Sequence, residues 1–84
     1  MNFKHNQLTI LPQSIGRLTR LTYLDLSNNM LRQLPNSIGD LTNLEGLIVS
    51  TNHLFTLPMS IGNITGLNRL ILGRNKLTFL PETI

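Results

Sequence analysis

The amino-acid sequence repeats itself with a step of 23 residues. Proline recurs at this spacing, and an asparagine recurs six residues before each proline. The repeated positions are Pro12, Pro35, Pro58 and Pro81; Asn6, Asn29, Asn52 and Asn75; and Gly16, Gly39 and Gly62. A regular step of this length is typical of a chain built from stacked supersecondary units. Because one unit cannot bury its apolar side chains alone, we expect neighbouring units to supply each other's core.

One complete unit occupies residues 18–40 and reads LTRLTYLDLSNNMLRQLPNSIGD. Further copies occupy residues 41–63 and 64–84, and a partial copy occupies residues 1–17. The unit resembles the 23-residue class of leucine-rich repeat, written LxxLxxLxLxxNxLxxLPxxIGx. Its LPxxIG segment is similar to that of Ras-suppressor-type, plant intracellular Ras-group and bacterial repeats. The resemblance implies an α/β repeat fold, a right-handed solenoid with a parallel concave β-sheet and short helical or 3-10 segments on the convex side.

The residues of each unit are consistent with this fold on physical grounds. Leu24 and Leu26 alternate with Asp25 and Ser27, which is the period of two that a half-buried strand requires. We expect such strands near residues 1–4, 22–27, 45–50 and 68–73.

A second set of repeated residues predicts how the chain turns after each strand. The asparagine side chain both donates and accepts hydrogen bonds, so it can pair backbone groups that lack a ladder partner. We therefore expect Asn6, Asn29, Asn52 and Asn75 to form a structural ladder. Proline suits the first position of a short helical turn. The glycine that follows it permits a left-handed or closely packed exit from that turn.

The length of the chain predicts a single domain over residues 1–84. The mass of 9.5 kDa leaves no room for a second domain. Neither end carries a polar capping segment, so we expect either a piece of a longer solenoid or two copies that cover each other's ends.

Composition excludes several classes of protein. There is no cysteine, which removes disulfides, zinc–thiolate sites and cysteine nucleophiles and favours a cytoplasmic location without proving it. Apolar residues make up 40% of the chain and charged residues 13%, which argues against a disordered chain. No apolar run is long enough to cross a membrane.

Within each predicted strand, the outward-facing positions vary while the inward-facing ones repeat. Because the repeated positions build the fold, the variable ones are free to recognise another molecule. Ile48 and Ile71 would lie side by side on this face, and an apolar pair bordered by an aromatic ring and charges is typical of a binding hot spot. The alternative is that β-branched residues simply favour strands. The predicted partner-binding residues are Tyr23, Asp25, Ile48, Arg69, Ile71 and Arg74.

A second candidate surface lies just after the strands, where Met30 is near His53 and Phe55. For these three side chains we expect a structural role, in which they pack against the loops.

Catalytic and metal sites are not supported. Asp25, Ser27 and His5 lie on adjacent strands of an open sheet, without the sheltered oxyanion site that a catalytic triad needs. His5 and His53 belong to repeats two strands apart, too far to share a metal. Phosphate-binding glycine motifs are absent. We expect no enzyme activity, cofactor or metal.

The sequence therefore predicts a protein-interaction module that binds through its concave strand face. The family resemblance implies another protein as partner, such as a small GTPase, a kinase or another signalling protein, or a host protein if the source is a bacterial effector. Nucleic acid is disfavoured, because the net charge is only +3 and one tyrosine makes no stacking platform. The alternative is a self-assembling fragment that forms dimers or stacked oligomers through its ends or concave face.

Overall fold

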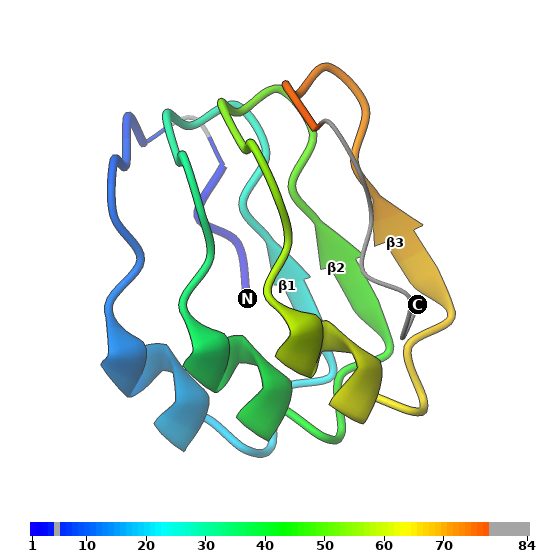
Figure 1. Cartoon of the computed structure of the whole chain (residues 1–84). Coiled ribbons are helices and arrows are strands. Elements are labelled where there is room, and N and C mark those ends of the chain that lie inside the picture. Colours follow the sequence, from blue (N-terminus) through cyan, green and yellow to red (C-terminus); the bar gives the residue numbers. More distant parts are fainter. Residues whose placement is uncertain (5, 78–84) are drawn as a thin grey trace.

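The computed structural model describes residues 1–4 and 6–77, in which short 3-10 helices alternate with short strands (Figure 1). The elements are η1 (Gln13–Arg17), β1 (Tyr23–Asp25), η2 (Asn36–Asp40), β2 (Gly46–Ile48), η3 (Met59–Asn63) and β3 (Arg69–Ile71). The strands form one layer and the helices lie on the opposite side of the core (Figure 1). The predictions for His5 and for residues 78–84 lie outside the described residues.

The three strands form a parallel sheet in the order β1-β2-β3. Each residue pairs with the residue 23 positions later, as Leu24 does with Leu47 and Leu47 with Leu70. The sequence repeat is therefore also the register of the sheet. Backbone hydrogen bonds continue past the strand ends, for example from the Thr51 N–H to the Gly73 carbonyl at 2.8 Å.

The prediction of a regular strand at residues 1–4 is wrong. Asn2 pairs with Asp25 through an isolated parallel bridge, held by hydrogen bonds from the Phe3 N–H to the Asp25 carbonyl and from the Asp25 N–H to the Met1 carbonyl. The other three predicted strands are present, and each is three residues long.

Each 3-10 helix begins directly after a proline. Pro35 is extended, with φ −69° and ψ 152°, and its carbonyl accepts the Ile38 N–H at 3.0 Å. Proline therefore precedes the helix and does not occupy its first position, a correction of one residue. The Ile38 carbonyl then accepts the Leu41 N–H, and the helix ends after five residues.

Close packing explains two of the repeated glycines, Gly16 and Gly39. No described glycine has a positive φ, so the left-handed exit is not used. At Gly39, a Cβ atom would lie 2.5 Å from the Ser60 carbonyl oxygen, and at Gly16 it would lie 2.7 Å from that of Ser37. Glycine therefore allows η1, η2 and η3 to approach one another closely.

Among the described residues, positive φ angles occur instead at Gln7, directly after Asn6, and at the residues just before the other three repeated asparagines. Asn28, Thr51 and Arg74 have φ of 58°, 56° and 60°. Asparagine tolerates this left-handed conformation, whereas a β-branched residue such as threonine is strained by it.

The asparagines tie neighbouring repeats together through buried backbone groups. The Asn52 amide donates to the Leu26 carbonyl at 2.9 Å and to the Val49 carbonyl at 3.0 Å. Its oxygen accepts the Leu31 N–H at 3.1 Å. Asn29 and Asn75 bridge adjacent repeats in the same way. The Asn6 side chain is exposed and donates to the Phe3 carbonyl.

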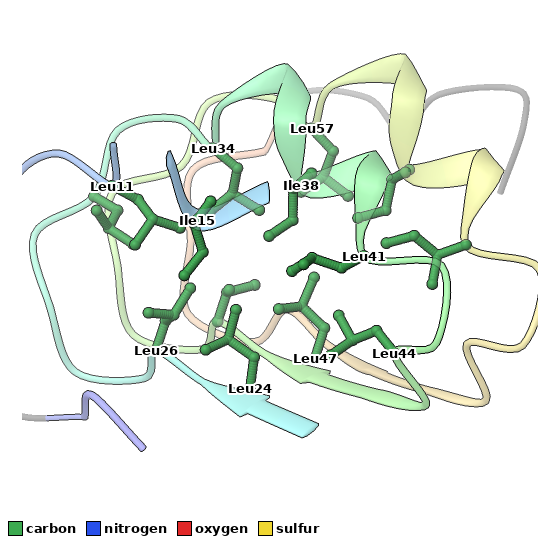
Figure 2. Close-up of a cluster of buried hydrophobic side chains, with 14 of the residues drawn as sticks. Leu11, Ile15, Leu24, Leu26, Leu34, Ile38, Leu41, Leu44, Leu47 and Leu57 are labelled. Atoms are coloured by element: carbon green, nitrogen blue, oxygen red, sulfur yellow. The ribbon is translucent and has the colours of Figure 1, made fainter. Parts of the chain in front are cut away.

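Leucine and isoleucine side chains fill the space between the strand layer and the helix layer (Figure 2). Leu24 and Leu47 come from the strands, and Ile38 comes from η2; all three are fully buried. The core is thus shared by successive repeats, as the repeat pattern predicts. Among the described residues, no helix is long and apolar enough to cross a membrane.

Candidate functional site

The outward side of the sheet, which we call the strand face, carries alternate residues of β1, β2 and β3. Leu24 and Leu47 point into the core, so the residues on either side of them point away from it. Five of the predicted binding residues belong to the strand face, and Arg74 follows β3 by three residues. The strand face comprises Tyr23 and Asp25, Gly46 and Ile48, and Arg69 and Ile71.

Ile48 and Ile71 form an apolar pair on the strand face. They are partners in the register of β2 and β3, so their backbones lie about 4.8 Å apart. Ile71 is 39% exposed, and Ile48 is half-buried. The pair therefore offers a small apolar surface that the fold itself leaves accessible.

Tyr23 extends this surface in a way that the sequence did not indicate. A Cβ atom on Gly46 would lie 2.5 Å from both Cδ1 and Cε1 of Tyr23, so the tyrosine ring lies across the Gly46 backbone. The ring is 39% exposed and covers the strand beside Ile48. The sequence signal for this contact was Gly46, which stands at the position that Tyr23 and Arg69 occupy in the neighbouring repeats.

Asp25 is held in place by its own strand. Its Oδ1 accepts the Ser27 N–H at 3.0 Å and the Ser27 hydroxyl at 2.7 Å. Ser27 is 7% exposed, so the hydroxyl that donates to this carboxylate is largely shielded from solvent. Asp25 thus stabilises the end of β1, and its carboxylate is less free for a partner than the sequence suggested.

Positive charge gathers along β3. Arg69, Arg74 and Lys76 are exposed, and within residues 1–4 and 6–77 none of them forms an ion pair. Among the described residues, the exposed carboxylate nearest to this edge in the register belongs to Glu45, which precedes β2. The strand face is therefore apolar at its centre and cationic on the β3 side.

The second candidate surface, which contains Met30, His53 and Phe55, is more exposed than the sequence predicts. Met30 is 46% and Phe55 49% exposed, and His53 is also exposed, so the prediction that these side chains pack down against the loops is wrong. Their backbones explain this result, because the Met30, His53 and Phe55 N–H groups bond to carbonyls of the preceding repeat. The bonds bring the segments together while leaving the side chains outside.

Within the described residues, no three histidine, cysteine, aspartate or glutamate residues lie close enough to hold a metal ion. The strand face carries the Tyr23 ring, the pair of isoleucines, one carboxylate and one cation, Arg69.

Parallel strands in a 23-residue register, backed by short helices and asparagine bridges, define a repeat protein. A family model described as a leucine-rich repeat region matches residues 1–84, and the chain belongs to the leucine-rich repeat family. Modules of this family are typically non-catalytic and generally bind other proteins.

The chain is also similar to the solved structure of a leucine-rich repeat protein from Leptospira interrogans. The two share 43% sequence identity with a TM-score of 0.96 over 98% of this chain. That match covers 21% of the other protein, so the present chain spans about a fifth of its length. No curated protein sequence matches the chain.

Proposed function

We propose that this chain is a non-catalytic interaction module that binds a partner protein through its strand face. In this proposal the stacked repeats form a right-handed solenoid, and the strand face is its concave side. The observation that carries the proposal is the pair of half-buried Ile48 and exposed Ile71, on the same face as the Tyr23 ring. Hot spots at protein interfaces are enriched in such partly sheltered anchors ringed by polar groups.

The experiment selects binders from a library of random displayed peptides and compares the parent chain with the double variant Ile48→Thr/Ile71→Thr. Threonine suits a strand, so the fold should survive with a change in stability of about 1 kcal/mol or less. Affinity for the selected peptides should fall by about tenfold or more, because the apolar contact is lost. Circular dichroism checks the fold.

The matched control is Met30→Thr/Phe55→Thr. It removes at least as much exposed apolar surface, from the second surface, and should leave affinity unchanged. If the control variant loses binding while the strand-face variant keeps it, the site lies on the second surface and the proposal is wrong.

Self-association is a second candidate, favoured by an apolar hollow at the first repeat. This hollow has a volume of about 340 Å³, and its lining includes Phe3, Leu8, Ile10 and Leu18. At the position equivalent to Leu8, Leu31 of the next repeat is fully buried. A second copy that covered the hollow would bury these side chains as a neighbouring repeat does. Molar mass measured by light scattering across a dilution series tests this, since a constant monomer mass rejects it.

A further inference from the structure

The strand face has a chemical asymmetry that limits which partner can bind there. Arg69 lies two residues before Ile71, and Arg74 lies three residues after it. At about 3.3 Å per residue, the two backbone positions are roughly 7 Å and 10 Å from Ile71 along the strand direction. Exposed cationic residues therefore precede and follow Ile71 along the chain, Arg69 on the strand face and Arg74 beyond the end of β3.

These cations have no counter-charge among the described residues. Neither Arg69 nor Arg74 forms an ion pair there, and both are exposed. The carboxylate that shares the strand face, Asp25, lies two strands away and already accepts two hydrogen bonds from Ser27. A partner that placed carboxylates beside the arginines would gain charge-assisted hydrogen bonds without breaking an existing ion pair.

The backbone at the end of these strands supplies an independent observation. Thr51 and Arg74 adopt the left-handed conformation that Asn28 adopts at the equivalent position of the preceding repeat. Asparagine or glycine would be unstrained there, so the fold does not explain these two residue types. Strained residues of this kind gather at functional sites. Thr51 and Arg74 flank Ile48 and Ile71, at the carboxyl ends of the same two strands.

We propose that the strand face binds an extended acidic peptide segment, in which an apolar side chain rests on Ile48 and Ile71 and flanking carboxylates pair with Arg69 and Arg74. An extended ligand has the same rise per residue and presents alternate side chains to one face. Acidic residues two positions to one side of the apolar residue, and two or four positions to the other, would therefore face Arg69 and Arg74. This inference rests on the proposed function and adds the partner's chemistry to it.

The test selects displayed random peptides on the parent chain and on the charge-reversed variant Arg69→Glu/Arg74→Glu. The parent should enrich sequences with Asp or Glu on both sides of Leu, Ile or Phe. Synthetic versions of these peptides should bind the variant about tenfold or more weakly, because two attractive contacts become repulsive. Their affinity for the parent should also fall with rising salt.

The matched control is Arg17→Glu/Arg20→Glu, which changes two exposed arginines at η1 and the turn that follows it. Each double reversal lowers the net charge of +3 by four, to −1. Both variants therefore share one net charge, and only the strand-face variant should lose affinity. Titrations can follow Tyr23 fluorescence, because the chain has one tyrosine and no tryptophan and the synthetic peptides can omit both.

Each outcome supports or overturns the inference. Acidic binders that depend on Arg69 and Arg74 support it. Binders that depend on Ile48 and Ile71 but carry no acidic residues overturn it and leave the proposed function standing. Binders that depend on neither pair, or a library that yields no binder, overturn both. Binding of a single-stranded oligonucleotide is the last comparison. If the oligonucleotide binds more tightly than every selected peptide and binds the Arg69→Glu/Arg74→Glu variant more weakly, the two arginines contact nucleic acid. That result overturns the peptide assignment.

Discussion

Replacing Gly39 by alanine should destabilise the fold although alanine is the better helix former. The added Cβ would lie 2.5 Å from the Ser60 carbonyl oxygen and 2.6 Å from the Ser60 Cβ. Contacts this short force η2 and η3 apart, because the atoms that block the methyl group are backbone oxygen and the start of a side chain. Overpacking of this kind costs about 1–3 kcal/mol.

An opposing term comes from the unfolded state. Alanine restricts the unfolded chain and on that account stabilises the fold by about 0.4–1 kcal/mol. Gly66→Ala isolates this term, because a Cβ at Gly66 meets no atom within 4 Å and its φ is not positive. The unfolded-state contributions should largely cancel between the two variants, so the difference between their unfolding free energies should be about 1–3 kcal/mol.

Urea unfolding followed by far-ultraviolet circular dichroism measures both variants. For a domain of this size, each 1 kcal/mol corresponds to a shift in Tm of about 4–8 °C. Equal stability of Gly39→Ala and Gly66→Ala would refute the close approach of η2 and η3, and with it the close-packing explanation of the repeated glycine.

Two further substitutions test the turns. Asn52→Ala should lower the unfolding free energy by about 1–3 kcal/mol, because the Leu31 N–H and the Leu26 carbonyl lose a buried partner; the exposed Asn6 should tolerate alanine far better. Comparable losses in urea unfolding would contradict the role assigned to the buried bonds. Thr51→Asn should raise stability by about 1 kcal/mol by relieving the left-handed strain, with a higher Tm as the readout. A lower Tm would show that the threonine side chain contributes more than its backbone strain removes.

The strand-face experiments and these stability experiments address separate properties. Ile48, Ile71, Arg69 and Arg74 are accessible to a partner, whereas Gly39 lies between packed repeats. Variants of the first group should change binding with little effect on unfolding, and Gly39→Ala should do the reverse wherever the fold persists.

The arrangement of the repeats could be predicted from the sequence, because it depends on the residue pattern within one unit and on the recurrence of that unit every 23 residues. A step of 23 residues places Leu24 beside Leu47 and Asn29 one repeat before Asn52. The period of two within each strand then separates the core face from the strand face. These properties follow from residue order alone.

Other features depend on distances between repeats, and only the tertiary structure decided them. The sequence shows that Gly46 leaves an open position one strand away from Tyr23, but only the structure shows that the Tyr23 ring occupies it. The exposure of Phe55 likewise follows from how its backbone bonds to the preceding repeat. Periodicity specifies which residues are neighbours, whereas the separation of the packed layers determines which side chains are covered.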